Sequence, residues 1–339
     1  MKALLYADWD TLRMTDMSKP EPGPDEVLVR VEAAGICGSE LEGVRNRSPR
    51  RTPPLVLGHE FAGVIESVGP EVEGWKAGDL VVPNALIACG TCKACKRGES
   101  SLCYSRGIFG MNRPGAFAEF VTAPVSTLLR RPAHVTGGQG AMTEPLANGV
   151  HICGLLESAK PKTVVVYGAG PIGLFAAQAI RALLGSRVAM VDRLADRLDI
   201  AKRVGIEFVA TPGEHLHDEL REWAGETEID ASVDAVGVGA TNTSSVAVVR
   251  PGGTIVWIGI GHNQMSLSLF DLVLPGKKLL GSYASTQAEM QVALDLIAEG
   301  RVDADSWVTP YSLDEADKAF YEMMNPSPGA VKGLITMPA

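Results

Sequence analysis

The segment from residue 162 to residue 192 constrains the fold of this chain more than any other stretch. A β-branched run leads into the turn Gly168-Ala-Gly170-Pro-Ile-Gly173, an apolar helical run follows, and a second apolar run ends at Asp192. This order predicts a strand, a tight turn, a helix and a parallel strand, which is one unit of a doubly wound α/β sheet. The glycines suit the turn, a close approach of a pyrophosphate to the backbone, and close packing of helix on strand.

The same unit has the features of a dinucleotide site. The helix N-terminus offers unpaired N–H groups and the positive end of the helix dipole to phosphates. Asp192 follows Gly173 by about 20 residues, the spacing at which an acid accepts hydrogen bonds from the adenosine ribose. A carboxylate there repels the 2′-phosphate of NADP, so we expect NAD, although Arg193 beside it is of the type that receives such a phosphate.

Strand and helix patterns continue to alternate after Asp192, which extends the parallel sheet. Ligands of such sheets bind at the carboxyl ends of the strands, which places Gly237 and Gly259 with Gly168 and Asp192 at the predicted site. The first 130 residues instead read as short strands separated by proline and glycine turns. We therefore expect two domains, one β-rich and one α/β, in this chain of 339 residues.

Four cysteines close together predict a structural metal site. Two consecutive C-x-x-C steps and a further cysteine contribute Cys89, Cys92, Cys95 and Cys103. Four thiolates complete a tetrahedral zinc shell and leave no open position. An iron–sulfur cluster is the competing interpretation, but the proline that ends the bacterial ferredoxin run is absent after Cys103.

A second, more dispersed set of donors predicts a catalytic metal site. Cys37, His59, Glu60 and Glu144 supply the sulfur, nitrogen and oxygen atoms that zinc takes in sites with an open position. Each alone also has an ordinary explanation: a buried thiol for Cys37, a structural histidine for His59, and a helix entry for Glu144 beside a proline.

The overall composition excludes several classes of partner. The net charge of −9 argues against nucleic acid, whose phosphates require a basic face. No apolar run reaches the length that spans a membrane, and the N-terminus lacks the pattern of a secretory signal. We expect a cytoplasmic protein with reduced cysteines and with no membrane or nucleic-acid partner.

The motifs at residues 35–39, 58–60, 89–103, 144–146 and 168–173 occur in the order typical of zinc-dependent medium-chain alcohol and polyol dehydrogenases. The chain resembles this family over essentially its whole length. The resemblance implies an α/β fold in which a Rossmann domain with a doubly wound parallel sheet interrupts a GroES-like, β-rich catalytic domain.

On this basis the catalytic domain spans residues 1–152 and 287–339, with the structural zinc lobe at 89–103, and the NAD-binding domain spans residues 153–286. The sequence is most similar to the branch of sorbitol, threonine and galactitol-phosphate dehydrogenases. In that branch an acid replaces a cysteine of ordinary alcohol dehydrogenases as the third ligand, and Glu144 matches it.

The resemblance also implies roles for individual residues. Cys37 and His59 match catalytic zinc ligands, with Glu60 or Glu144 as the third. The other acid would hold the zinc-bound water or become a ligand in a different state of the site. Ser39 matches the hydroxyl that binds the substrate alcohol and begins a proton relay, and Phe109 and Glu144 match substrate contacts. The residues that match contacts to NAD are Gly168, Gly170, Pro171, Ile172, Gly173, Asp192, Arg193, Arg197, Val236, Ile258, Gly259, Ile260 and Ser282.

Two positions depart from the family pattern. Glu42 stands where the family often has a relay histidine, so either Glu42 or water takes the proton from Ser39. Ala284 stands where sorbitol dehydrogenases carry an arginine that touches cofactor and substrate, which argues against sorbitol itself.

A polar loop at residues 44–51 carries four arginines between two predicted metal ligands: Arg45, Arg47, Arg50 and Arg51. Guanidinium groups bind phosphates and carboxylates through paired hydrogen bonds, so we consider Arg47 a candidate for binding a charged or polyhydroxylated substrate. The plainer interpretation is a solvated basic loop.

Together these features predict a zinc-dependent enzyme that transfers a hydride between NAD and a secondary alcohol, such as a polyol, a cyclitol or a sugar derivative with or without a phosphate. It would bind one catalytic and one structural zinc ion and, as family members do, form a homodimer or homotetramer. The alternatives are a threonine-type amino-alcohol dehydrogenase, or an inactive binding protein on the same fold.

Overall fold

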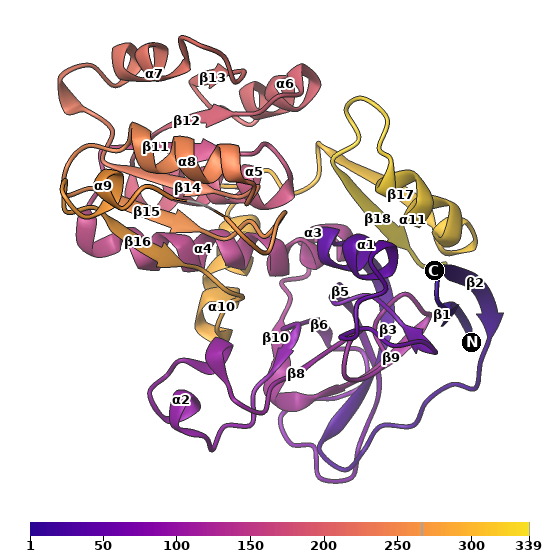
Figure 1. Cartoon of the computed structure of the whole chain (residues 1–339). Helices are drawn as coiled ribbons and strands as arrows, with labels where there is room; N and C mark the ends of the chain where they lie inside the picture. The colour runs from indigo at the N-terminus through magenta and orange to yellow at the C-terminus, as the bar shows by residue number, and fades with distance from the viewer. Residues whose placement is uncertain (266, 339) are drawn as a thin grey trace. The chain divides into compact units, whose positions relative to one another are not determined.

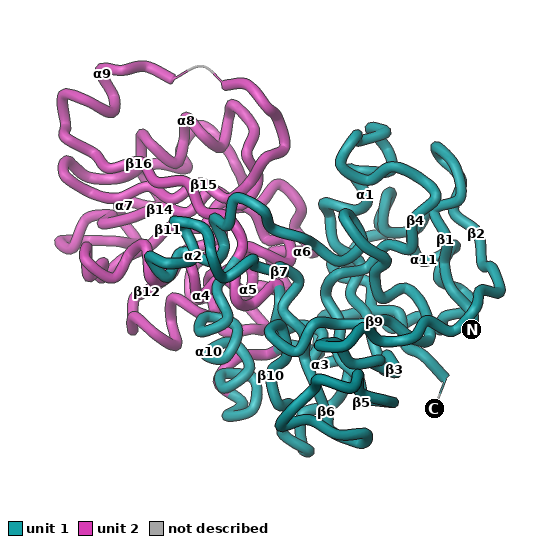
Figure 2. The backbone as a smooth tube through the Cα atoms, turned by 90° about the horizontal axis from the view of Figure 1, so that it is seen from below, with its two compact units in different colours: residues 1–144, 285–300, 304–339 teal, residues 145–284, 301–303 magenta. Residues whose placement is uncertain are grey.

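The computed structural model describes residues 1–265 and 267–338, which form two compact units (Figure 2). Unit 1 comprises residues 1–144, 285–300 and 304–339, and unit 2 comprises residues 145–284 and 301–303. The first boundary between the two units, after residue 144, falls within helix α4 (Thr143–Leu156). No helix in the described ranges is both long enough and apolar enough to span a lipid bilayer.

Unit 1 is a β-rich fold built on a seven-stranded sheet (Figure 1). The strand order is β10-β6-β5-β3-β18-β17, and β9 also pairs with β3. The other sheets of the unit have the orders β2-β1-β4 and β7-β8. The strands are β1 (Lys2–Asp8), β2 (Thr11–Asp16), β3 (Glu26–Gly35), β4 (Leu55–Val56), β5 (Glu60–Val68), β6 (Leu80–Pro83), β7 (Leu86–Ile87), β8 (Gly107–Ile108), β9 (Phe120–Pro124), β10 (Leu128–Arg130), β17 (Val308–Ser312) and β18 (Lys332–Thr336).

The central strand β3 organises unit 1. Its apolar side chains are buried on both faces, as expected for a strand with several neighbours. It pairs antiparallel with β5, and the register places Gly35 opposite Glu60. The residues that follow β3 and those that begin β5 are therefore neighbours, which brings two distant parts of the sequence to one place.

Helix α1 (Gly38–Arg45) follows β3 directly. The polar loop expected at residues 44–51 thus begins later than predicted, because the buried Val44 extends the helix. The remaining helices of unit 1 are α2 (Lys93–Lys96), α3 (Gly137–Ala141), α10 (Gln287–Ala298) and α11 (Ala316–Met324).

Unit 2 is a parallel sheet of six strands in the order β13-β12-β11-β14-β15-β16, which confirms the predicted doubly wound fold (Figure 1). The strands are β11 (Thr163–Tyr167), β12 (Arg187–Val191), β13 (Phe208–Ala210), β14 (Ala231–Asp234), β15 (Thr254–Trp257) and β16 (Lys278–Gly281). The helices are α5 (Pro171–Ala179), α6 (Ala195–Arg203), α7 (Leu216–Ala224), α8 (Gly239–Val248) and α9 (Leu269–Leu272). The strand order reverses between β11 and β14, and ligands of such sheets bind at this switch point.

The turn between β11 and α5 depends on its glycines. A Cβ atom on Gly173 would lie 1.8 Å from the carbonyl oxygen of Gly168, so no larger residue fits. Gly168 itself has a φ of +98°, which side chains with a Cβ rarely adopt. The helix can therefore pack on the strand only with these two glycines in place.

We expect Gly173→Ala to lower the free energy of unfolding by more than about 2 kcal/mol, because the added methyl group overlaps a backbone oxygen that cannot move freely. Urea unfolding followed by circular dichroism measures this loss. Gly239→Ala is the matched control, since nothing lies within 4 Å of its Cβ position. Equal stability of the two variants would contradict this account of the turn.

Candidate metal centres and cofactor site

The four cysteines predicted to hold a structural zinc ion come together in one lobe of unit 1. Their sulfur atoms all lie within 4.8 Å of one another. The Sγ–Sγ distances are 3.5 Å for Cys92–Cys95, 4.0 Å for Cys89–Cys95 and 4.0 Å for Cys92–Cys103. These distances exclude disulfide bonds, and they match the edge of about 3.8 Å of a tetrahedron with a zinc–sulfur bond of about 2.3 Å.

The thiols of this lobe differ widely in pKa. Backbone N–H groups of Thr91 and Cys92 lower the pKa of Cys89 to about 6, whereas burial and neighbouring sulfurs raise the pKa of Cys95 to about 12. Such a split is expected when several thiols crowd together without a cation. A divalent cation would stabilise all four thiolates, so the lobe fits a structural zinc ion.

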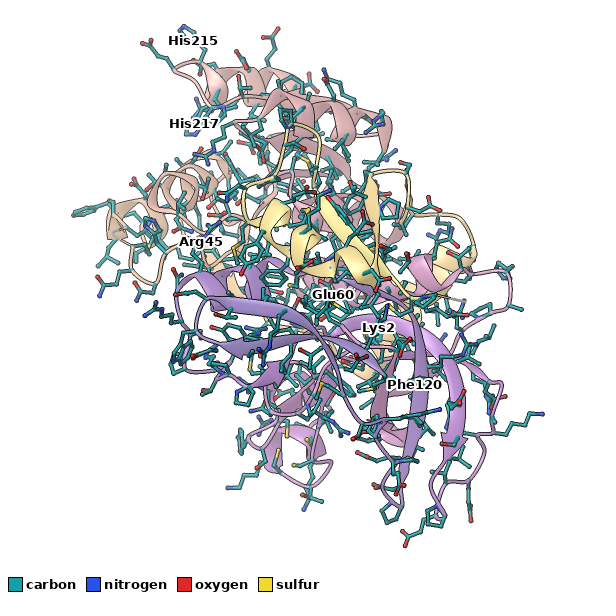
Figure 3. The ribbon with its side chains drawn as sticks, turned by 90° about the vertical axis from the view of Figure 1, so that its right-hand side faces the viewer. Lys2, Arg45, Glu60, Phe120, His215 and His217 are labelled. Atoms are coloured by element: carbon teal, nitrogen blue, oxygen red, sulfur yellow. The ribbon has the colours of Figure 1, made fainter. Side chains whose placement is uncertain are left out.

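A second group of donors forms where β3 ends and β5 begins. Ligand atoms of Cys37, His59 and Glu60 lie within 4.8 Å of one another. Cys37 caps the N-terminus of α1, and Glu60 is the first residue of β5, in the interior of unit 1 (Figure 3). One sulfur, one nitrogen and one oxygen donor are the ligands of a zinc site that keeps a position open for substrate.

Glu60 therefore completes the three-donor group. Glu144 is the second residue of α4 and is not a member of this group in the ranges that the structure describes. Its predicted role, as a ligand or as the residue that holds the zinc-bound water, remains a prediction.

A residue that the sequence analysis missed, Glu40, supports two of the donors. Its fully buried carboxylate accepts hydrogen bonds from the backbone N–H of Cys37 at 3.2 Å and of Gly58 at 2.9 Å, and it lies 2.7 Å from Nδ1 of His59. This arrangement directs Nε2 of His59 toward the donor group, as carboxylates behind histidine ligands do in metal sites. Burial lowers the pKa of His59, but the electrostatic and hydrogen-bond contributions of Glu40 and Cys37 together outweigh burial and raise that pKa well above its ordinary value.

The sequence contained one signal for Glu40. It lies three residues after the helix cap, where a glutamate bonds back to the cap in a capping box, and the structure has this motif at Cys37.

Lys332 is a second missed residue. Its Nζ binds the carboxylate of Glu60 and donates to the carbonyl oxygen of Ile36 at 2.9 Å, and both side chains are buried. A Cβ atom on Gly35 would lie 2.2 Å from Oε2 of Glu60, so glycine is required there to accommodate this carboxylate. The lysine balances the charge of Glu60 and occupies one of its oxygens, which leaves the other for a metal ion.

The predicted relay residue, Ser39, lies on the first turn of α1 and is exposed. Its hydroxyl donates to Sγ of Cys37 at 3.3 Å, so it lies beside the donor group. Glu42 lies one turn later on the same helix and is also exposed.

Two predicted substrate residues have other partners. Arg47 forms an exposed ion pair with Asp10, through Nε at 3.0 Å and through Nη2. Phe109 is completely buried and packs edge-on against Phe61. Their contacts with substrate remain predictions.

In unit 2 the glycine turn presents an accessible backbone. Pro171 is the first residue of α5, and no side chain caps this helix N-terminus. A Cβ atom on Gly170 would meet only Nη1 of Arg197, at 3.9 Å. Free N–H groups, an uncrowded turn and an adjacent guanidinium fit the phosphates of a dinucleotide.

Asp192 has a structural role as well as its predicted one. It accepts hydrogen bonds from the backbone N–H of Ala169 at 2.7 Å and of Leu194 at 2.9 Å, so it ties the end of β12 to the glycine turn. A carboxylate has about four lone-pair positions and can still accept bonds from a ribose. Arg193, next to it, is exposed.

The other predicted cofactor residues line the ends of β14, β15 and β16. The buried Asp234, missed from the sequence, accepts from the N–H of Val236 at 2.8 Å and of Gly237 at 2.9 Å. Its carbonyl oxygen accepts from Ile258 and Gly259. The Oγ of Ser282 is buried and has no hydrogen-bond partner in the described residues. A polar group of a bound cofactor would supply the missing partner.

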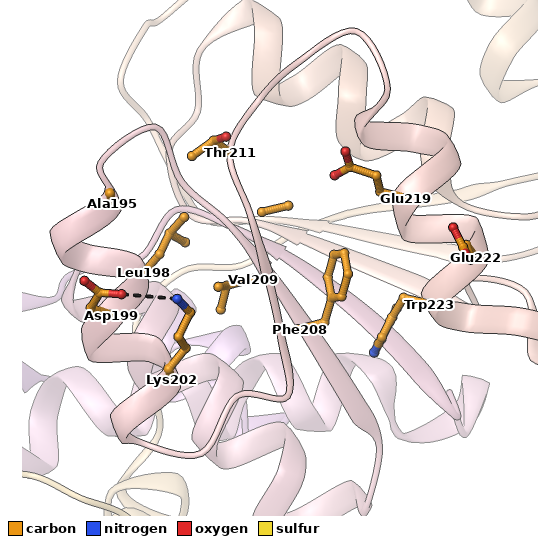
Figure 4. A pocket seen from close by; sticks show the side chains of 11 residues that line it. Ala195, Leu198, Asp199, Lys202, Phe208, Val209, Thr211, Glu219, Glu222 and Trp223 are labelled. Carbon is orange, nitrogen blue, oxygen red and sulfur yellow. Dashed lines mark hydrogen bonds and ion pairs between the residues drawn. The ribbon is translucent and has the colours of Figure 1, made fainter.

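A hollow of about 680 Å³ lies elsewhere in unit 2, between α6 and α7 over β13 (Figure 4). It is lined by Leu198, Phe208, Trp223 and an ion pair between Asp199 and Lys202 at 3.2 Å. It contains none of the predicted site residues, so we assign the cofactor to the switch point and not to this hollow.

The two metal centres should respond differently to loss of a ligand. We expect Cys95→Ser to remove one zinc ion and to destabilise the fold, because binding of a structural zinc ion is part of the folding free energy. We expect His59→Ala to abolish turnover with only a small change in melting temperature. Metal analysis of the wild-type protein should give two zinc ions per chain. A value of one would contradict the assignment of two metal centres.

Comparisons with known proteins agree with this geometry. Residues 23–133 match the alcohol dehydrogenase GroES-like domain, and residues 171–299 match the zinc-binding dehydrogenase domain. The chain is 32% identical to a sorbitol dehydrogenase of Arabidopsis thaliana, over 92% of this chain and 88% of the relative. It is 30% identical to an L-threonine 3-dehydrogenase of Escherichia coli, over 98% of both chains.

A similar solved structure is a zinc-binding dehydrogenase from Sinorhizobium meliloti 1021 bound to NADP, with a TM-score of 0.91, 31% identity and coverage of 99% of this chain and 98% of that one. The family predicted from the sequence motifs is thereby confirmed. The protein is a zinc-dependent, NAD(P)-dependent dehydrogenase, and the chain belongs to the zinc-containing medium-chain alcohol dehydrogenase family.

Proposed function

We propose that the enzyme oxidises a secondary alcohol of a polyol, cyclitol or sugar derivative with NAD⁺. The observation that carries this proposal is the group of Cys37, His59 and Glu60 with the hydroxyl of Ser39 beside it. Three protein donors leave a position for an alcohol oxygen, and a serine hydroxyl next to that position can accept its proton.

The residues have distinct tasks in this proposal. Zinc, held by Cys37, His59 and Glu60, supplies Lewis acidity that lowers the pKa of the alcohol. Ser39 accepts the alcohol proton as it passes its own to Glu42 or to water. Bound NAD⁺ would accept the hydride of the alcohol carbon, so that one alcohol and one NAD⁺ would yield a carbonyl compound, NADH and a proton.

A threonine-type amino-alcohol dehydrogenase is the second candidate, and the similarity to a threonine dehydrogenase over nearly the whole chain supports it. The inactive binding protein considered from the sequence does not fit a member of a zinc-dependent dehydrogenase family that has a complete donor set and the relay serine in place.

We expect NADH to form with at least one neutral or phosphorylated polyol, and kcat/KM to be at least about tenfold higher with NAD⁺ than with NADP⁺, because the carboxylate of Asp192 repels a 2′-phosphate. A spectrophotometric screen of polyols, cyclitols, sugar phosphates and L-threonine measures both. Turnover of threonine alone would favour the second candidate, and no turnover of any polyol, cyclitol or sugar derivative would contradict the proposal. Equal or better use of NADP⁺ would refute the cofactor assignment.

We further propose that the protein is a cytoplasmic homodimer or homotetramer. The six cysteines are free thiols, as expected where zinc thiolate sites form. An apolar patch on α9 and the residues just after it contains Leu269, Phe270, Val273 and Leu274, each at least 64% exposed. It lies in the segment that precedes the edge strand β16, and a second copy related by a two-fold axis could cover both the patch and the edge.

Light scattering coupled to gel filtration should therefore give a mass of at least two chains. The double variant Phe270→Glu with Leu274→Glu should shift it to the 35.8 kDa of one chain, because the charges cannot be buried at the interface. Val292→Glu, at an exposed position of α10, is the control. A monomeric wild type would contradict the proposal.

A further inference from the structure

Arg51 is a buried arginine whose hydrogen bonds go to the relay serine. Its side chain is only 5% exposed. Nη1 donates to the carbonyl oxygen of Ser39 at 3.0 Å, and Nη2 donates to its Oγ at 3.1 Å. The same guanidinium therefore contacts both the backbone and the hydroxyl of one residue.

The charge of Arg51 has no direct counter-ion. In the described ranges no carboxylate forms an ion pair with it, and its Nε is buried without an acceptor. The nearby carboxylate is that of Glu40, whose pKa Arg51 helps to lower. Burial of an unpaired cation is costly, so its position calls for a reason other than stability.

Helix α1 is shaped to admit this side chain. A Cβ atom on Gly43 would lie 3.1 Å from Cδ and 3.3 Å from Nη1 of Arg51. A glycine inside a helix costs about 1 kcal/mol relative to alanine. Gly43 therefore destabilises the helix slightly but leaves the space that the side chain of Arg51 occupies.

The contact restricts what the hydroxyl of Ser39 can do. A guanidinium only donates, so it occupies one lone pair of Oγ. Without substrate the single hydroxyl hydrogen points to Sγ of Cys37, and it is this hydrogen that Ser39 would release to Glu42 or to water when it accepts the alcohol proton. One lone pair is left, on an exposed side chain next to the metal donors. That lone pair is the one available to an alcohol.

We propose that Arg51 is a positioning residue, which holds Ser39 with its free lone pair toward the alcohol and places a permanent positive charge near the oxygen that becomes negative. The proposal rests on the proposed alcohol oxidation. It assigns to Arg51 a role different from that of Arg47, whose guanidinium is exposed and paired with Asp10.

A double-mutant cycle tests whether Arg51 acts through Ser39. We expect Arg51→Gln to lower kcat about tenfold with little change in KM, since the contact matters most as charge develops. The pH at which kcat is half-maximal should shift upward, because loss of a nearby positive charge disfavours the alkoxide. The double variant with Ser39→Ala should be no slower than Ser39→Ala alone. A wild-type kcat and pH profile in Arg51→Gln, or losses that multiply in the double variant, would overturn the proposal.

Arg113 is a matched control for these variants. It too contacts the carbonyl oxygen and the hydroxyl of a single residue, Thr122, through Nη2 at 3.0 and 2.7 Å, and its Nε is likewise buried without a partner. Unlike Arg51, it also forms an ion pair with Glu26 at 2.8 Å. Arg113→Gln should lower the melting temperature and leave kcat unchanged. If it reduced kcat as much as Arg51→Gln, the loss would reflect general destabilisation and the proposal would fail.

A readout without turnover separates this inference from the proposed function. With Co²⁺ in the site of Cys37, His59 and Glu60 and zinc kept in the four-cysteine lobe, the sulfur-to-cobalt absorption band of Cys37 reports on the hydrogen bond from Ser39. We expect Arg51→Gln to shift this band and Arg113→Gln to leave it unchanged, even if no alcohol is found to be a substrate. An unshifted band would overturn the positioning role.

Arg51→Lys is the second variant, in case the glutamine variant does not fold. Lysine keeps the charge but cannot contact both oxygens of Ser39 with a rigid fork, so kcat should lie between wild type and the tenfold loss. A lysine variant with wild-type kcat and an unshifted band would contradict the two-point contact.

Discussion

The buried carboxylate of Glu40 is the interaction on which the candidate metal site depends. It joins two segments that are separate in sequence, because it binds the backbone of Cys37 and of Gly58 and the ring of His59. The pairing of β3 with β5 brings these segments together, and Glu40 then fixes the orientation of the donors that they carry. A metal ion thus meets ligands that are already oriented, so that little binding energy is spent on ordering them.

Buried cations contact residues of this site. Glu60 and Glu40 are carboxylates in and behind the donor group, and Lys332 and Arg51 are buried cations bonded to Glu60 and to Ser39. Each cation is therefore attached to a residue with a different proposed task, one in metal binding and one in proton transfer. Such placement of fixed charges before the reaction begins is how protein sites stabilise charge that develops during it.

Local patterns allowed much of this structure to be predicted. The glycine turn, the alternation of strands and helices, and the four-cysteine lobe are encoded in short segments, so the family, the parallel sheet and the structural zinc site followed from the sequence. Lys332 was not predictable in this way, because it lies 272 residues from Glu60 in the sequence. Nor could the sequence separate the four arginines of one loop, of which Arg51 is buried and Arg47 is exposed. Burial and partners, which depend on the tertiary fold, distinguish them.

The central claim is that the protein has two zinc centres with unlike ligands, one of four sulfurs and one of a single sulfur with nitrogen and oxygen. X-ray absorption at the zinc edge of the fully loaded protein tests this most directly, because it counts sulfur neighbours. The account predicts an average of about 2.5 sulfur atoms per zinc ion at about 2.3 Å, with the remaining neighbours at the shorter distances of nitrogen and oxygen. An average of four sulfurs would mean that only the cysteine lobe binds zinc, and it would contradict the assignment of Cys37, His59 and Glu60 as a metal centre.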